Sequence, residues 1–204
     1  MDRSTTCLCL LVSALILVRC SGTTLQYQGS LDTPETEYAR ALSFFELKKF
    51  DKVERALRRA IELDNSYAPA YVGMSRLFLE KGNVKEAIRY VHLARIQDIN
   101  YIPCWNMAGH LYYISGQYKA AANEFQEAIT RDKEKFWAVQ TYFDLGLTLE
   151  KMGELEKAHE AYMTIISLDP LDLNARTAVK RIREVLGPSF LMKLQYENKD
   201  QILP

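Results

Sequence analysis

Histidine and cysteine are the side chains most able to support catalysis or metal binding in this chain of 204 residues, which has three histidines and four cysteines. His92, His110 and His159 lie far apart, and none stands at the spacing of zinc ligands. The chain has no nucleophile elbow, phosphate-binding loop, dinucleotide fingerprint or paired-histidine zinc motif. We therefore expect no catalytic residue, no metal site and no cofactor.

The cysteines divide into a cluster near the start of the chain and one distant residue. Cys7 and Cys9 lie in an apolar run, Cys20 follows that run, and Cys104 stands alone. Without the apolar run and Cys20, a single thiol remains, so a disulfide framework is excluded. We expect Cys104 to be a small apolar residue within a helix.

The first residues differ from the rest in composition. Residues 7–18, CLCLLVSALILV, carry no charge, and Arg19 ends the run. A bilayer-spanning helix needs about 20 apolar residues, whereas a secretory signal peptide needs about 7–15. The run predicts an exported protein with a signal peptide over 1–19 and a flexible tether over 20–33. The alternatives are an uncleaved signal anchor and a buried helix.

The whole chain is electrically balanced, with 26 basic and 26 acidic residues. Nucleic-acid binding and polybasic membrane anchoring both rely on surplus Lys and Arg, so composition gives neither any support. The hydrophobic share of 48% is ordinary for a globular protein. With only 9 Gly and 6 Pro there is little turn material for many short strands. The composition favours a helical body.

The segment around Cys20 resembles the lipobox of bacterial lipoproteins, an apolar stretch that ends in a small residue followed by the cysteine that is acylated. Here it reads Leu17-Val18-Arg19-Cys20, and it departs from the family at Arg19, where Gly, Ala or Ser is usual. The resemblance implies an exported protein held at a membrane by lipid on Cys20. The alternative is an ordinary cut near residues 20–23, which would leave a soluble secreted or periplasmic protein.

A repeat begins after residue 33. Gly82, Gly116 and Gly153 stand in similar contexts, 34 and then 37 residues apart, and Lys48 holds the same position one unit earlier. Around each of them the pattern is apolar helix, short turn, apolar helix. Such periodicity indicates stacked repeats, because no single unit can bury its apolar stripe alone.

The repeat resembles the tetratricopeptide repeat. The first helices carry an aromatic residue, a pair ending in a small residue and another large residue, and the second helices carry Ala, a large residue and another small or apolar residue. The matches are Tyr71, Met74, Ser75, Phe78, Ala87, Val91 and Ala94; Trp105, Ala108, Gly109, Tyr112, Ala121, Phe125 and Ala128; and Tyr142, Leu145, Gly146, Leu149, Ala158, Tyr162 and Ile165. Ala41, Phe44 and Ala60 fit a weaker first unit, and Pro170 closes the fourth.

The resemblance implies an all-α, right-handed solenoid of about four helix pairs without strands. We expect units over 34–67, 68–101, 102–138 and 139–171, a capping helix over 172–187, and a tail over 188–204 that either packs on this helix or is mobile. Trp105, Tyr112, Phe125 and Tyr142 are expected in the core. Three extra residues near 136–138 predict a longer turn or, alternatively, an exposed aromatic contact at Trp137.

In this family, positions on the first helices point into a concave groove that holds a partner peptide or helix. Carried over, they are Tyr38, Leu42, Phe45, Val72, Arg76, Leu79, Asn106, His110, Tyr113, Phe143, Leu147 and Glu150. The resemblance thus implies a non-catalytic interaction scaffold that supports assembly of a cell-envelope complex. The alternative is a structural protein that associates with itself, which exposed Phe190, Leu191 and Met192 would favour.

Overall fold

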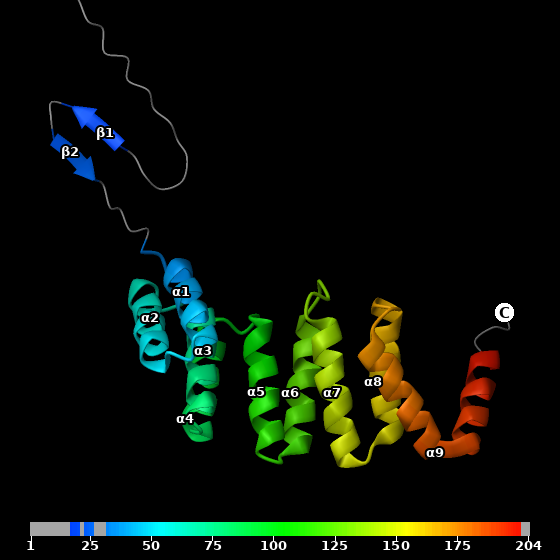
Figure 1. The fold of residues 1–204 in the computed structure, drawn as a ribbon. Coiled ribbons are helices and arrows are strands. Elements are labelled where there is room, and N and C mark those ends of the chain that lie inside the picture. The colour runs from blue at the N-terminus through cyan, green and yellow to red at the C-terminus, as the bar shows by residue number, and fades with distance from the viewer. Residues whose placement is uncertain (1–16, 21–22, 27–31, 201–204) are drawn as a thin grey trace, which may run out of the picture.

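The computed structural model describes residues 17–20, 23–26 and 32–200. Its helical body is a row of antiparallel helix pairs (Figure 1). The helices within the described residues are α1 (Pro34–Glu46), α2 (Phe50–Leu63), α3 (Ala68–Glu80), α4 (Val84–Gln97), α5 (Ile102–Ile114), α6 (Tyr118–Arg131), α7 (Ala138–Met152), α8 (Leu155–Leu168) and α9 (Leu173–Asp200).

Two short strands precede the helices. β1 (Leu17–Cys20) pairs antiparallel with β2 (Thr23–Gln26), and Cys20 stands opposite Thr23. The solenoid itself, residues 32–200, contains no strand, as the sequence predicts, and the hairpin that precedes it was not foreseen. Most of the predicted signal run lies outside the described residues.

Each first helix of a pair ends in the same left-handed turn. Gly82, Gly116 and Gly153 have φ of 76°, 72° and 77°, and Lys48 takes the equivalent position with φ of 50°. The following N–H donates to a carbonyl five residues back, as from Asn83 to Phe78 at 2.8 Å. This bond closes a Schellman motif and satisfies a terminal carbonyl of the helix. The glycine register read from the sequence is confirmed.

Helix pairs pack closely because a small residue on the first helix faces a large one on the second. A Cβ added to Gly109 would lie 2.5 Å from the Phe125 ring, and one on Gly146 would lie 2.6 Å from the Tyr162 ring. By register the earlier units pair Ala41 with Leu57 and Ser75 with Val91. The small residue is therefore Ala or Ser where its partner is aliphatic, and Gly where its partner is aromatic.

Among the described residues the core forms four clusters along the solenoid, and partly buried residues such as Phe78 and Tyr112 pack against two clusters each. Trp105 and Phe125 are buried as expected, whereas Tyr112 and Tyr142 are only partly buried. Cys104 is fully buried, as its predicted role as an apolar helix residue requires, and burial raises the pKa of its thiol.

The first helices form the inner layer of the solenoid. α3 contacts both α1 and α5, and α5 also contacts α7. The extra residues before α7 form a longer turn, as predicted. Asp132 accepts hydrogen bonds there from the backbone N–H groups of Phe136 and Trp137, at 3.1 and 2.7 Å.

The last helix, α9, consists of two arms. Ala175, Ala178, Val179 and Ile182 of the first arm (173–186) join the core beside α8. Gly187 then has φ of 74° and ψ of −173°, which breaks the helix, and the second arm (188–200) turns away (Figure 1). The helix breaks at Gly187, where the sequence predicts that the capping helix ends, and the second arm continues as a helix through residue 200.

Candidate functional site: the concave groove

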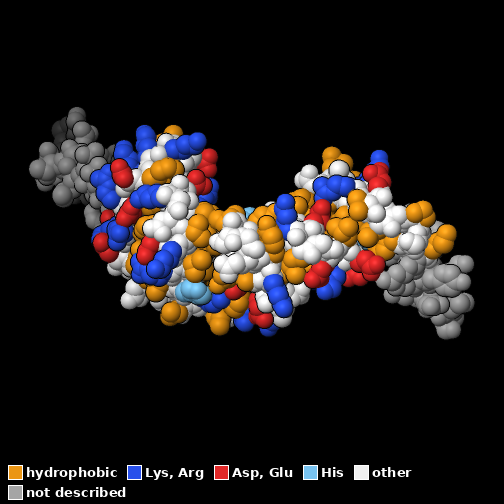
Figure 2. Space-filling model, turned by 90° about the horizontal axis from the view of Figure 1, so that it is seen from below, with side chains coloured by type: hydrophobic (Ala, Val, Ile, Leu, Met, Phe, Trp, Pro, Cys, Tyr) orange, Lys and Arg blue, Asp and Glu red, His pale blue; other side chains and the backbone are white. Residues whose placement is uncertain are grey.

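The inner layer encloses a groove of about 300 Å³. We call it the concave groove. In Figure 2 the outline of the molecule is hollowed along one edge between its two ends. The residues lining the concave groove come from α1, α3, α5, α7 and the turn before α7: Tyr38, Leu42, Phe45, Val72, Gly73, Arg76, Pro103, Asn106, Met107, His110, Trp137, Gln140 and Asp144.

The structure brings together most of the residues that sequence reasoning places here. Those of the first two units, apart from one leucine, and two from the third line the groove: Tyr38, Leu42, Phe45, Val72, Arg76, Asn106 and His110. Three helices far apart in the sequence thus contribute to one surface, as the repeat register predicts.

The remaining predicted residues lie outside the cavity. They are Leu79, Tyr113, Phe143, Leu147 and Glu150. The Phe143 ring packs on the Tyr162 ring, with centroids 5.6 Å apart. Glu150 accepts a 2.7 Å hydrogen bond from the Tyr162 hydroxyl and two 2.6 Å bonds from Arg181 of α9. The capping helix therefore engages the carboxylate that was expected to face a partner.

Sequence reasoning missed a second row of lining residues. Pro103 and Met107 on α5, and Gln140 and Asp144 on α7, are spaced by four residues and so share one face of each helix. α5 lies between α3 and α7 in the inner layer, and this second row of side chains reaches the concave groove from α5 and α7. The positions carried over from the family include only one of these two rows.

Trp137 lies at the edge of the groove and is 37% exposed. Its ring makes an edge contact with Phe136, with centroids 5.1 Å apart. The sequence offered a longer turn and an exposed aromatic residue as alternatives for the extra residues. Both features are present, because the longer turn holds the Trp137 ring at the edge of the groove.

A polar network lies where α5 meets α7. Asp144 is buried, with 8% of its surface exposed, and accepts a 3.1 Å hydrogen bond from Gln140. His110 Nε2 lies 3.4 Å from Asp144 Oδ2, and this interaction raises the pKa of His110. Thr141 donates a 3.1 Å hydrogen bond to Asn106. This end of the groove presents amide and imidazole groups with fixed orientations.

The opposite end of the groove is apolar and carries one cation. Leu42 is 39% exposed and lies near Phe45 and Val72 in the groove wall. The Arg76 guanidinium lies 4.8 Å from the centre of the Phe45 ring, a cation–π contact that orients it. The arrangement suits an apolar anchor of a ligand beside a hydrogen-bonding backbone.

The described residues offer no assembled chemical centre. No group of three or more His, Cys, Asp or Glu side chains among them is placed to hold a metal ion. His92, His110 and His159 belong to α4, α5 and α8 and do not converge. None of the described helices combines the length and apolar character needed to cross a bilayer.

Stacked antiparallel helix pairs around a concave inner layer define an α-solenoid. The family model of the tetratricopeptide repeat matches residues 102–135 and 139–170. Residues 102–135 and 139–170 are therefore two tetratricopeptide repeats.

Two proteins similar in sequence cover different shares of the chain. The uncharacterized protein ycf37 of Pyropia yezoensis is 26% identical over 133 residues, which are 63% of this chain and 71% of that protein. The protein O-mannosyl-transferase TMTC1 of Homo sapiens is 18% identical over 162 residues, which are 79% of this chain but only 18% of that protein.

Solved structures share the fold. PilF of Pseudomonas aeruginosa superposes with a TM-score of 0.67 at 19% identity, over 73% of this chain and 67% of that one. YrrB, described as a tetratricopeptide repeat protein with an unusual peptide-binding site, gives a TM-score of 0.55 at 21% identity, over 72% and 74% of the two chains. Tetratricopeptide repeats are in general protein-interaction scaffolds and are typically non-catalytic, and this chain has that architecture.

Proposed function

We propose that the protein is a non-catalytic scaffold that binds a peptide or helix of a partner protein in the concave groove. The observation that carries the proposal is the cavity built jointly by α1, α3, α5 and α7. Leu42, Phe45 and Val72 receive an apolar side chain of the partner. Asn106 and Gln140 form hydrogen bonds with its backbone. Anchors of this kind supply most of the affinity in peptide recognition.

A peptide selection tests the proposal. Peptides selected from a random display library on the purified protein are titrated against Leu42→Asp and against Ile96→Asp. Ile96 is an equally aliphatic residue on α4, is 74% exposed and does not line the groove. Both changes add the same charge at an exposed site, so neither should unfold the protein. We expect Leu42→Asp to weaken binding by about tenfold or more, and Ile96→Asp to leave it unchanged. Equal effects of the two changes would contradict the proposal.

We further propose that the protein is exported, carries lipid on Cys20 and supports assembly of a cell-envelope complex. The uncharged run 7–18 followed by Cys20 supports this. Each buried methylene contributes about 0.8 kcal/mol, so two or three acyl chains hold a protein at a membrane firmly. The body from residue 20 onward carries 24 basic and 25 acidic residues, so it has no positive surplus to attract it to a membrane.

Intact mass and membrane fractionation of the wild type and Cys20→Ser test the anchor. We expect an acyl mass increment on the wild type and release of Cys20→Ser from membranes. A wild-type mass without that increment, or equal membrane binding by both proteins, would refute it.

A further inference from the structure

The two arms of α9 occupy the register of a fifth repeat unit. Gly187 lies 34 residues after Gly153, and its φ of 74° matches the other turn glycines. The first arm packs on α8 as an inner helix does on the preceding pair. The second arm therefore stands where the second helix of a fifth unit would begin.

The second arm does not fold back as the second helices of the other units do. Gly153 has ψ of 8°, whereas Gly187 has ψ of −173°. The next residue is Pro188, whose ring disfavours the helical ψ in the residue before it. Pro188 also has no N–H, so it cannot make the hydrogen bond that Glu154 donates to Leu149 at 2.9 Å in the fourth unit.

Side-chain size also opposes closure of the fifth unit. The position that faces the large residue of the second helix is Ala41, Ser75, Gly109 or Gly146 in the first four units, and it is Lys180 in the fifth. Twelve residues after the turn position, the four units carry the fully buried Ala60, Ala94, Ala128 and Ile165. The fifth carries Lys199 at that register position.

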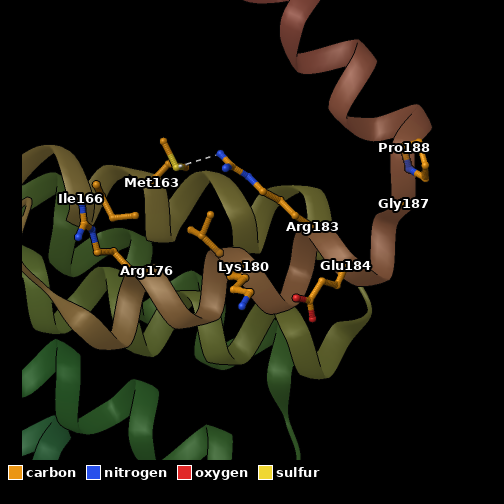
Figure 3. Close-up of a pocket in the computed structure, with 9 residues that line it drawn as sticks. Met163, Ile166, Arg176, Lys180, Arg183, Glu184, Gly187 and Pro188 are labelled. Carbon is orange, nitrogen blue, oxygen red and sulfur yellow. Dashed lines mark hydrogen bonds between the residues drawn. The ribbon is translucent and has the colours of Figure 1, made fainter.

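An open cavity of about 710 Å³ lies where the missing helix would pack. We call it the fifth-unit seat. Its floor is apolar, formed by Met163 and Ile166 of α8 and by Val179 of the first arm. Figure 3 shows these α8 side chains facing the first arm, with Gly187 and Pro188 where the chain turns away.

The rim of the fifth-unit seat is basic. It carries Arg176, Lys180 and Arg183 against the single carboxylate of Glu184. Arg183 is held in place because its Nε donates a 3.0 Å hydrogen bond to His159 Nε2, and burial lowers the pKa of that imidazole, which keeps it neutral and accepting. No ion pair with an acidic side chain is found for these three cations among the described side chains.

We propose that the fifth-unit seat binds an acidic amphipathic helix of a partner protein, which completes the fifth repeat in trans. The apolar floor receives the partner's apolar stripe, and the three cations pair with flanking carboxylates. Phe190 of the chain's own second arm reaches α8, with its ring centroid 5.2 Å from that of His159. This arm, or that of a second copy, suits the seat poorly, because its sequence has a lysine at the register position that is buried and uncharged in the other four units. The site is separate from the concave groove.

Two synthetic helical peptides of equal length test the proposal. They share one apolar stripe and differ only in having Glu or Lys at the flanking positions. Fluorescence anisotropy measures their binding to the purified protein. We expect the Glu peptide to bind saturably and more tightly than the Lys peptide. Arg176→Glu combined with Lys180→Glu should weaken it by roughly tenfold or more, as two lost charge pairs imply.

The control carries the same change of net charge elsewhere. Lys85→Glu combined with Lys133→Glu alters exposed residues outside the seat and should leave binding of the Glu peptide unchanged, as should Leu42→Asp in the concave groove. Equal affinity for both peptides, or an equal loss in the control, would overturn the proposal. So would a dimer that the Arg176 and Lys180 changes dissociate, because the occupant would then be a second copy.

Discussion

At Gly109 the backbone of α5 approaches the Phe125 ring so closely that no side chain fits between them. A Cβ there would lie within 2.8 Å of three ring atoms. Ser75, the equivalent residue of the second unit, does carry a Cβ, and by register it faces the smaller Val91. Its hydroxyl is buried and has no hydrogen-bond partner among the described residues. The two positions should therefore respond in opposite directions to alanine.

We expect Gly109→Ala to lower the free energy of unfolding by about 1–3 kcal/mol, because the added methyl overpacks the pair. Ser75→Ala removes an unsatisfied buried polar group and should raise that free energy by up to about 1 kcal/mol. Urea denaturation of both variants measures the difference. If Gly109→Ala were as stable as the wild type, the proposed close packing would be wrong.

His110 and His159 should titrate on opposite sides of the ordinary pKa of 6.5. The interaction with Asp144 raises the pKa of His110, whereas burial, and then the charge of Arg183, lowers the pKa of His159. The stability from His110 is thus present below pH 6.5 and lost as pH rises through its raised pKa. That from His159 is present above pH 6.5 and lost as pH falls through its lowered pKa.

Nuclear magnetic resonance titration of the imidazole carbons measures both values. Asp144→Asn should bring the pKa of His110 down and leave that of His159 in place. An unchanged His110 pKa in this variant would show that Asp144 does not hold the imidazole.

Among the turns that join the two helices of the four units, the one between α1 and α2 has no glycine at the left-handed position. Lys48 adopts the left-handed conformation that glycine holds in the later units. This conformation costs a residue with a side chain roughly 1 kcal/mol. Lys48→Gly should therefore raise the free energy of unfolding by about 0.5–1 kcal/mol, with Lys49→Gly, one position later, as a destabilising control. Thermal denaturation checks the direction, and a loss of stability in Lys48→Gly would refute the strain.

Trp105 joins the second and third helix pairs. Its Nε1 donates a 2.9 Å hydrogen bond to the Ile99 carbonyl. The guanidinium groups of Arg95 and Arg131 lie 3.8 and 4.3 Å from its ring centre, on α4 and α6. Arg95 is fixed in turn by a 2.6 Å ion pair with Glu124. This indole therefore holds three helices together.

Trp105→Ala should cost about 3–5 kcal/mol of unfolding free energy. Trp137→Ala is the matched control, since its ring is 37% exposed, and should cost less than about 1 kcal/mol. Chemical denaturation followed by circular dichroism measures both. Similar losses in the two variants would mean that the burial pattern is misassigned.

The sequence predicted the helix pairs because glycine spacing and apolar periodicity are local signals. The partner-binding positions of the family identified one of the two rows of residues that line the groove. Sequence reasoning missed Gln140 and Asp144, because whether they line the groove depends on how α7 packs against α5. It also treated Gly187 as a plain stop, although its distance from Gly153 was already a signal of a fifth unit. Exposure of Phe190 would have favoured the alternative of self-association, but this residue is buried, with its ring centroid 5.2 Å from that of His159.

On the scale of the whole molecule, the two surfaces proposed to bind partners are separate. The concave groove is lined by the N-terminal and central units, whereas the fifth-unit seat lies at the C-terminal end. Neighbouring units contact mainly each other, so the two surfaces are linked through the intervening helices. A scaffold of this form can hold two partners at a fixed separation.

The central claim is that a partner occupies the concave groove. Its most direct test is a photo-crosslinking amino acid placed at residue 42 or at residue 96 of the full chain in its native cell. We predict that position 42 captures a discrete partner polypeptide, that Arg76→Glu abolishes the product, and that position 96 yields none. Identical products from both positions, or none from position 42, would contradict the assignment of the groove.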